Sequence, residues 1–450
     1  MIVPRNKLLV WNGLVVVPFA TLGALFPETE TWCAAAIGMF LAIVLLDAAS
    51  SRRRLAGVSL EFPETVRMIK DREGEIELRI RNRGPKAQHV RLGLAFPEDI
   101  QPTREDLFVE LPDGDLTSLF RWPCTPCKRG RYLFNACYLE TPSLAGFWAV
   151  RRAAPVRFEV RVYPNLMSER KKLAALFLNR GDFGAYITRQ AGQGREFEKL
   201  REYVHGDTYE HIHWKTTAKR GRPVTKLFQV ERTQEVYVIV DASRLSGRHV
   251  SAASDYGLNG HAETVLERFI TAALVMGVAA ERQGDLFGVA TFSDCVHRFV
   301  RAKSGRAHYT ACRDAIYGLQ PRTVTPDYDE ICSFIGMRLR RRALLVFLTS
   351  LDDPVLAESF ERNMDLLRKR HLVLVGMLRP SEAYQVFSRP DSASLDDLYR
   401  HLAGHLLWHD LRELEKVLQR RGVRFFLLDN ERMCPQLVSH YMDVKQEQLV

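Results

Sequence analysis

Three histidines and an aspartate, side chains of types that bind metal ions, cluster between residues 205 and 213. They are His205, Asp207, His211 and His213. Residues two apart on a strand point to the same face, so His211 and His213 would lie together if this segment is extended. Imidazole nitrogens and carboxylate oxygens are common ligands of Zn²⁺. Zinc binding is one interpretation of this group, and a structural role without metal is the other.

A second group of histidines has helical spacing. His401, His405 and His409 recur every four residues, so a helix would place them in one stripe. The stripe could bind metal, but Leu402 and Trp408 beside it are apolar residues typical of a packed face. We therefore interpret the three histidines as lying at the edge between a packed helix face and solvent.

The number and spacing of the cysteines indicate reduced thiols. Eight of them are scattered over 450 residues, and only Cys124 and Cys127 form a CxxC pair, with Cys137 nearby. A zinc site usually takes four ligands, often as two such pairs, and the sequence has no second pair. A secreted disulfide framework would be denser and would occupy a shorter chain. The pattern favours free thiols in the cytoplasm, with a redox-active or metal-binding pair as the alternative.

No catalytic motif accompanies these groups. The sequence has no nucleophile elbow, phosphate-binding loop or dinucleotide fingerprint. Its net charge of +10 arises from 64 basic and 54 acidic residues, whose signs are mixed along the chain. Because no nucleic-acid-binding motif is present either, this pattern argues against a nucleic-acid partner.

The segment 192–221 packs charged side chains of both signs among aromatic and aliphatic ones. The residues that we single out in it are Arg195, Glu196, Arg201, Tyr203, Asp207, Trp214, Lys215 and Arg220. Charges of alternating sign around buried aromatic rings, including Tyr203 and Trp214, could form an ion-pair network that braces two domains. They could equally form an interface, because arginine and aromatic residues dominate the binding energy of interfaces.

This segment resembles the signature of a bacterial family, the domain of unknown function 58 proteins. The matching positions are Gly194, Arg195, Glu196, Phe197, Leu200, Arg201, Tyr203, Gly206, Asp207, Ile212, Trp214, Lys215, Ala218 and Arg220. The resemblance implies a short membrane hairpin and a C-terminal half similar to von Willebrand factor A domains. It also implies a MoxR-type AAA+ ATPase as partner. The implied function is a non-enzymatic, membrane-tethered scaffold or adaptor in chaperone-like assembly or maturation of other proteins.

The von Willebrand factor A resemblance further implies a metal site where the strands end. Its opening motif, Asp-x-Ser-x-Ser, corresponds here to Asp241 and Ser243, but Leu245 stands in place of the second serine. A later aspartate of the site would be Asp352 or Asp353, displaced from its usual step. Mg²⁺ is the cofactor that such oxygen ligands hold. The alternative function is therefore metal-dependent binding or an enzymatic activity at the Asp241 and Ser243 end of the sheet. Without metal these residues only cap a strand end.

Two apolar stretches near the N-terminus predict membrane helices. Leu8–Phe26 carries no charge, and Trp32–Leu46 is apolar again after a short break. A membrane helix needs about 20 mostly apolar residues, so we expect helices at about 8–26 and 30–48, within residues 1–54. A signal peptide would account for the first stretch but would leave the second unexplained.

Charge predicts how these helices are oriented. Arg5 and Lys7 precede the first helix and three arginines at 52–54 follow the second, whereas the connection carries Glu28 and Glu30. The positive-inside rule then places both ends of the hairpin in the cytoplasm. We expect a multi-pass protein of the bacterial cytoplasmic (inner) membrane with its soluble domains in the cytoplasm.

Two further regions follow the hairpin. Residues 58–163 contain short alternating runs broken by Gly, Pro and Asn, such as Glu75–Asn82, and predict an immunoglobulin-like β-sandwich. Residues 164–235 form a connector that includes the segment 192–221 and begins with a helix over Met167–Phe177.

Residues 236–450 alternate apolar runs with amphipathic segments. The expected strands are 236–240, 287–292, 343–349, 372–378 and 423–429. The expected helices are His261–Arg282, Tyr309–Leu319, Tyr328–Arg341, Pro354–Arg370 and Leu395–Arg421. The order βαββαβαβαβ predicts an α/β doubly wound sheet, in which ligands bind beyond the carboxyl ends of the strands. We therefore expect a multi-domain fold class: a transmembrane helical hairpin, an immunoglobulin-like β-sandwich and an α/β doubly wound domain, which the family resemblance implies to be von Willebrand factor A-like.

Overall fold

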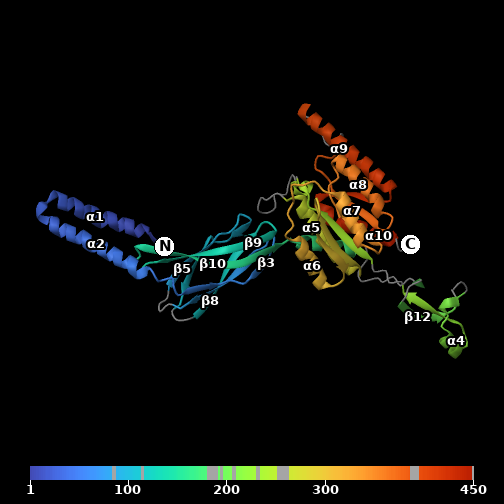
Figure 1. Ribbon diagram of the computed structural model, residues 1–450, viewed down its shortest axis with the longest axis horizontal. Coiled ribbons are helices and arrows are strands. Elements are labelled where there is room, and N and C mark those ends of the chain that lie inside the picture. Colours follow the sequence, from blue (N-terminus) through green and yellow to red (C-terminus); the bar gives the residue numbers. More distant parts are fainter. Residues whose placement is uncertain are drawn as a thin grey trace. The chain divides into compact units, whose positions relative to one another are not determined.

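The computed structural model of this chain describes residues 1–83, 88–112, 116–179, 191–192, 196–204, 209–229, 234–250, 263–385 and 395–447. The chain consists of two compact units, Met1–Asn165 and Leu166–Val450 (Figure 1).

The first unit begins with two apolar helices, as the sequence predicts. α1 (Asn6–Leu25) and α2 (Glu30–Ser51) are joined by the short turn η1 (Pro27–Thr29). Their most apolar windows have mean hydropathies of 1.9 and 2.1, and both helices are long enough to cross a membrane. No side chain of α1 is buried in the protein. A helix of this length spans about 30 Å, the thickness of a bilayer's hydrocarbon core, so lipid is the medium that suits these exposed apolar side chains.

The carboxyl-terminal end of α2 is attached to the β-structure that follows. The side chain of Asp47 accepts hydrogen bonds from the Ser143 hydroxyl at 2.6 Å and from the Ala145 backbone N–H at 3.0 Å. The indole N–H of Trp148 donates to the Val44 carbonyl oxygen at 3.0 Å. Because Asp47 is buried, these bonds satisfy a carboxylate that would otherwise be costly to desolvate.

Two sheets form the rest of the first unit. The first has the order β1-β10-β9-β5-β7, with β3 also paired to β10, and the second has the order β2-β4-β8-β6. The strands of the first are β1 (Ile2–Pro4), β3 (Thr65–Ile69), β5 (Gln88–Leu94), β7 (Asp106–Leu111), β9 (Gly130–Pro142) and β10 (Trp148–Tyr163). Those of the second are β2 (Val58–Glu61), β4 (Gly74–Asn82), β6 (Ile100–Pro102) and β8 (Leu116–Pro126).

Both sheets contribute to one hydrophobic core. On β4, Ile76, Leu78 and Ile80 are all fully buried, as the alternating pattern predicts. They share a cluster with residues of the other sheet, including Phe134 and Val160. The architecture is therefore two layers of sheet packed face to face, and the immunoglobulin-like topology within it stays a prediction.

The thiols of this unit, Cys124, Cys127 and Cys137 among them, are buried and form no disulfide. Burial raises the pKa of Cys124 to about 11 and that of Cys137 to about 12. Since the thiolate is the reactive form, Cys124 and Cys137 behave as small apolar groups.

The second unit begins with α3 (Met167–Asn179), which packs Leu173 and Phe177 into the core of the α/β domain. The segment after it forms a small lobe. β11 (Ala191–Gly192), β12 (Glu196–Glu202) and β13 (Val224–Gln229) make a three-stranded sheet of order β11-β13-β12. Between β12 and β13 lie the turn η2 (Tyr209–His211) and the helix α4 (Trp214–Arg220).

The α/β domain is built on a six-stranded sheet of order β16-β15-β14-β17-β18-β19. The strands are β14 (Glu235–Asp241), β15 (Leu286–Phe292), β16 (Val296–Lys303), β17 (Ala343–Leu348), β18 (Leu372–Leu378) and β19 (Arg424–Leu428). All neighbours are parallel except β16, which pairs antiparallel with β15. The five strands that the sequence predicts are all present.

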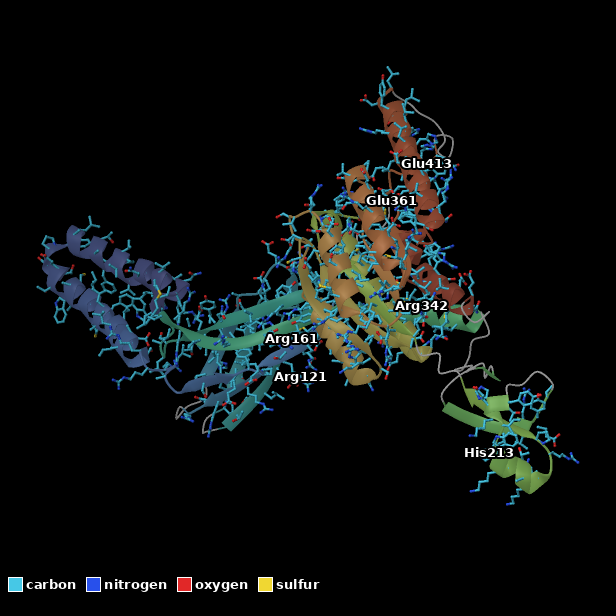
Figure 2. All side chains as sticks on the ribbon, turned by 45° about the vertical axis from the view of Figure 1, so that its right-hand side comes forward. Arg121, Arg161, His213, Arg342, Glu361 and Glu413 are labelled. Carbon is cyan, nitrogen blue, oxygen red and sulfur yellow. The ribbon has the colours of Figure 1, made fainter. Side chains whose placement is uncertain are left out.

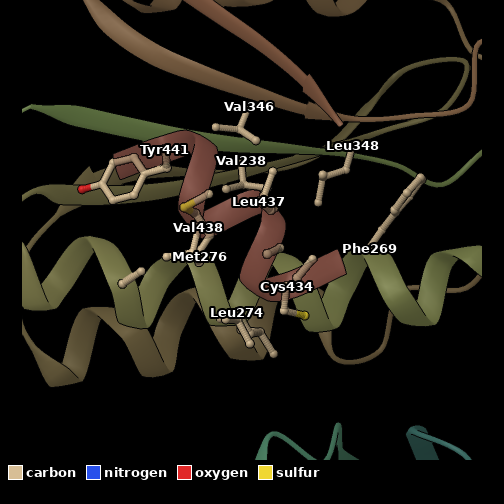
Figure 3. Close-up of a cluster of buried hydrophobic side chains, with 14 of the residues drawn as sticks. Val238, Phe269, Leu274, Met276, Val346, Leu348, Cys434, Leu437, Val438 and Tyr441 are labelled. Carbon is tan, nitrogen blue, oxygen red and sulfur yellow. The ribbon is translucent and has the colours of Figure 1, made fainter. Parts of the chain in front are cut away.

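Helices cover both faces of this sheet. They are α5 (Val265–Arg282), α6 (Arg306–Ile316), α7 (Tyr328–Arg338), α8 (Pro354–Leu367), α9 (Leu395–Arg420) and α10 (Met433–Glu447). Successive residues of β14 enter different cores: Val238 packs with α5 and α10, whereas Tyr237 and Ile239 pack with α7, α8 and α9. Figure 3 shows the first of these cores, where Leu437 and Val438 of α10 approach Val238. α10 was not among the helices expected from the sequence.

Candidate functional site

Three neighbouring parallel strands end at one edge of the α/β sheet and bring polar residues there. Asp241 is the last residue of β14, Ser293 follows β15, and Thr349 follows β17. Apart from the partly exposed first residues of β14 and β15, these strands are buried, and the three polar residues at their ends are buried as well. This carboxyl edge is where doubly wound sheets bind ligands.

Asp241 is fully buried and fully hydrogen-bonded. Its Oδ2 accepts from the Thr349 hydroxyl at 2.6 Å, and its Oδ1 accepts from the Ser243 backbone N–H at 2.8 Å. The Tyr328 hydroxyl lies 2.9 Å from Thr349 Oγ1. Since the single Thr349 proton is given to Asp241, Tyr328 must donate to Thr349. The result is a chain of donors, Tyr328 to Thr349 to Asp241, closed off from solvent.

Burial shifts the acidity of this network. The pKa of Asp241 is raised, mainly because burial disfavours its charged form, while the hydrogen bonds from Thr349 and Ser243 oppose the shift. The pKa of Tyr328 is raised well above its ordinary value, first by burial and then by the charge of Asp241. A carboxyl so enclosed is held at the strand ends by its hydrogen bonds and has no contact with solvent.

Two arginines follow Asp241 on the turn η3 (Arg244–Gly247) and after it. Arg248 forms an ion pair with Asp352, and Arg244 lies 3.8 Å from Asp353. Both arginine side chains are about half exposed, at 50% and 49%, whereas that of Asp352 is only 12% exposed. Asp353 also caps α8 by accepting from the Val355 N–H at 3.0 Å. The pairs tie the loops after β14 and β17 together and leave guanidinium groups at the surface.

The site predicted for Mg²⁺ at Asp241, Ser243 and Asp352 has an incomplete set of donors. Both oxygens of Asp241 already accept hydrogen bonds, and Arg248 supplies a positive charge beside Asp352. Leu245, in place of the second serine, is buried and offers no oxygen. Ser243 Oγ is buried and near enough to Asp241 to help lower its pKa, but it makes no well-formed hydrogen bond. Mg²⁺ needs near-octahedral oxygen ligands; Ser243 Oγ and Asp352 Oδ1 are buried oxygens without a hydrogen-bond partner, and water would have to complete the set.

A further polar cluster lies on the turn between β15 and β16. Asp294, Cys295 and His297 bring one ligand atom each to within 4.8 Å of one another. The pKa of Asp294 is lowered, chiefly by the hydrogen bond from Ser293. The pKa of His297 is also lowered, mainly by burial and then by the positive charge of Arg322. This cluster was not predicted, because Cys295 is one of many scattered thiols in the sequence, although the spacing Asp-Cys-x-His directly after a strand is visible there.

The charged segment 192–221 lies on the small lobe, and the structure describes only some of its residues. Arg195 and Asp207 lie outside the described residues, as does the side chain of Glu196, the first residue of β12. Arg201 is exposed on β12, and the Tyr203 ring stacks on Tyr209 with centroids 5.9 Å apart.

The expectation that Trp214 is a buried anchor is wrong. Its side chain is 69% exposed, and α4, which it begins, has no buried residue. Lys215 and Arg220 on the same helix are exposed too. The helix is held by its ends instead of by a buried face. His213, labelled in Figure 2, accepts from the Thr216 N–H at 3.2 Å, and Gly221 adopts the left-handed conformation (φ 66°) that ends the helix.

The histidine groups do not assemble metal sites in the described residues. His211 lies in a 3-10 turn and His213 caps α4, so the expectation that they share one face of a strand is wrong. His205 lies outside the described residues. On α9, His405 stacks on Trp408 with centroids 5.7 Å apart, and His401 meets Tyr384 edge-on at 5.5 Å. These contacts fit the packing interpretation of the stripe.

Comparison with solved structures gives distant matches. A PapD-like domain of human CEP192 covers 24% of this chain and 87% of its own length at 11% identity, with a TM-score of 0.19. An aerotolerance-related membrane protein from Bacteroides fragilis covers 47% and 99% at 11% identity, with a TM-score of 0.31. The PilB minor pilin from Streptococcus sanguinis covers 92% and 98% at 8% identity, with a TM-score of 0.31. Similarity at this level carries no argument about fold or function.

Sequence comparison is more specific in one region. No curated protein matches the chain. Residues 199–385, which run from the small lobe into the α/β domain, match the model of the family described as protein of unknown function DUF58, the family that segment 192–221 resembles.

Proposed function

We propose that this protein is a non-enzymatic scaffold, tethered to the bacterial inner membrane, that docks a MoxR-type AAA+ ATPase. Through that partner it takes part in chaperone-like assembly or maturation of other proteins. The match of residues 199–385 to the DUF58 family supports the partner, because the family resemblance implies it. The apolar helices α1 and α2 support the tether, and the arginines at 52–54 favour soluble domains on the cytoplasmic side.

In this proposal the α/β domain is von Willebrand factor A-like. Its strand order, with a single antiparallel strand, β16, at the edge of an otherwise parallel sheet, supports that assignment. The assignment makes the carboxyl edge a docking face. Arg244 and Arg248 are half exposed there and keep N–H groups available for a carboxylate of the partner. An arginine-based edge would then bind acidic groups without an intervening metal ion.

The observation that carries the proposal is the exposure of Trp214 among basic residues. A tryptophan that is 69% exposed contributes little to the fold around it. Tryptophan and arginine are also the residues most enriched where binding energy concentrates in protein interfaces. Lys215 and Arg220 on the same helix are exposed and give it a positive charge. Of the two interpretations of segment 192–221, partner docking therefore fits α4 better than bracing does.

A test compares two alanine variants of exposed aromatic residues. The full-length protein is purified in detergent and mixed with the MoxR-type ATPase of the same genome, with ATP or ADP present. Trp214→Ala should lose the ATPase while melting at the wild-type temperature. Tyr399→Ala, which removes an aromatic residue that is 68% exposed on α9, should retain it. A Trp214→Ala variant that still retains the ATPase, or a wild type that remains alone with every nucleotide, would contradict the proposal.

A further inference from the structure

We propose that the turn between β15 and β16 binds one transition-metal ion of the zinc class through Asp294, Cys295 and His297. The site is independent of the proposed docking function and of the Mg²⁺ site discussed above. The three ligand atoms lie within 4.8 Å of one another. In the described part of the chain, no other three His, Cys, Asp or Glu side chains converge in this way. Thiolate, imidazole and carboxylate together form a ligand set that Zn²⁺ accepts.

The spacing of the sulfur and nitrogen ligands fits a tetrahedral ion. Cys295 Sγ lies 3.6 Å from His297 Nδ1. With a Zn–S bond of about 2.3 Å and a Zn–N bond of about 2.05 Å at a tetrahedral angle, the two ligand atoms would be about 3.6 Å apart. The pair therefore needs little rearrangement to admit the ion. A simple thiol–imidazole hydrogen bond has a similar length, and the experiment below distinguishes the two.

Ser293 holds the imidazole in the orientation that metal binding requires. Its Oγ lies 2.6 Å from Asp294 Oδ1 and 2.7 Å from His297 Nε2. A serine has one proton, which it donates to the carboxylate, so it accepts the Nε2–H of the histidine. That tautomer leaves the lone pair of Nδ1 directed toward Cys295. Outer hydrogen bonds of this kind fix the ring and tautomer of metal-binding histidines.

The turn itself is fixed and open to solvent. The Ser293 N–H donates to the Cys295 carbonyl at 3.0 Å, and the Asp327 N–H donates to the Ser293 carbonyl at 2.8 Å. Asp294 and Cys295 are exposed, so an ion can enter from solvent. Three protein ligands leave a fourth position for water or a partner's group. Arg322 is a cation whose charge acts on both Asp294 and His297.

Cobalt is the probe for this site. Co²⁺ is added to the reduced, full-length protein in detergent. We expect one equivalent to bind with the intense d–d absorption of a tetrahedral ion and a thiolate-to-cobalt charge-transfer band, and Zn²⁺ to displace it. Cys295→Ser and His297→Ala should lose the charge-transfer band or the binding. Ser293→Ala should bind about 10- to 100-fold more weakly, because it loses only the outer hydrogen bonds. His409→Ala, an exposed histidine of α9, is the matched control and should bind as the wild type does.

Alkylation provides a second measurement that does not depend on colour. Of the eight cysteines only Cys295 is exposed, so a thiol reagent added to the folded protein reports on this residue. Zn²⁺ should protect it in the wild type and in His409→Ala, but not in His297→Ala. Co²⁺ that binds without a thiolate band, or equal affinity in Cys295→Ser, would overturn the proposal. So would alkylation that Zn²⁺ does not slow.

Discussion

Substitutions of Asp241 by asparagine and by alanine should differ in cost, because Asp241 accepts two hydrogen bonds in a closed network. Its acceptor atoms serve the Thr349 hydroxyl and the Ser243 N–H, and Tyr328 donates to Thr349 in turn. Alanine removes both acceptors. Asparagine keeps an acceptor for Ser243 and can donate to Thr349, which then donates to Tyr328.

The expected loss of stability in Asp241→Ala follows from the number of buried donors that lose their acceptor. In Asp241→Ala two buried donors do so, the Ser243 N–H and one hydroxyl proton. A buried donor left unsatisfied costs about 1–3 kcal/mol, so we expect a loss of about 2–6 kcal/mol. In Asp241→Asn the Ser243 N–H keeps its acceptor, but one hydroxyl proton loses its acceptor and the second Nδ2–H of asparagine enters unpaired. Asparagine keeps the side-chain volume that alanine loses, so it should leave the domain about 1–3 kcal/mol more stable than alanine, which also opens a cavity.

The stability difference between the wild type and Asp241→Asn should change with pH in a definite direction. Because the pKa of Asp241 is raised in the folded protein, mainly by burial, the folded state holds the proton more tightly than the unfolded chain does. This tighter binding of the proton stabilises the folded state. The stabilisation is complete below the unfolded pKa of about 3.9 and is lost as pH rises through the folded pKa. Asparagine does not titrate. The stability of Asp241→Asn relative to the wild type should thus rise with pH above about 4 and level off above the folded pKa.

Hydrogen exchange of the full-length protein in detergent measures the local stability of β14 and β17 through peptides from these strands. The method does not require two-state unfolding of the whole chain. Thr349→Val should loosen the same peptides, whereas Thr349→Ser, which keeps the hydroxyl, should not. Equal protection in the alanine and asparagine variants would refute the reasoning. Strong protection of the wild type by Mg²⁺ that both variants lose would show instead that Asp241 binds metal.

Further expectations concern the membrane hairpin. Asp47→Ala leaves the Ser143 hydroxyl and one backbone N–H without their acceptor, which should cost about 2–6 kcal/mol and expose the β9–β10 connection to limited proteolysis. With an impermeant thiol reagent on intact cells, Glu28→Cys should be labelled from outside, whereas the exposed native Cys295 should not be. Labelling of Cys295 in intact cells would contradict the cytoplasmic assignment.

Much of the α/β domain was predictable because its strands are buried on both faces. A continuous apolar run such as 343–348, placed between two amphipathic helices, is typical of a strand buried on both faces of a parallel sheet. The helix α10 was missed although Leu437, Val438 and Tyr441 recur at helical spacing and pack against the sheet. Its average hydropathy is low, so only its periodicity marks it as part of the core.

The candidate site was less predictable because its contacts join distant parts of the chain. Asp241 was recognised at the end of its strand, but its bond to Thr349 connects residues 108 positions apart. The pairing of Arg248 with Asp352, which gives the edge its charge, is equally remote in sequence. Trp214 was misjudged for a different reason. An aromatic residue in a charged segment suggests an anchor, and only tertiary structure shows that α4 buries no side chain.

The affinity of the purified MoxR-type ATPase for the full-length protein in lipid nanodiscs tests the central claim most directly. The proposal predicts saturable binding that responds to nucleotide. It also predicts that Trp214→Ala weakens binding by about 2 kcal/mol or more, which is a loss of about 30-fold in affinity. Absence of binding in every nucleotide state, or equal affinity of the wild type and Trp214→Ala, would contradict it.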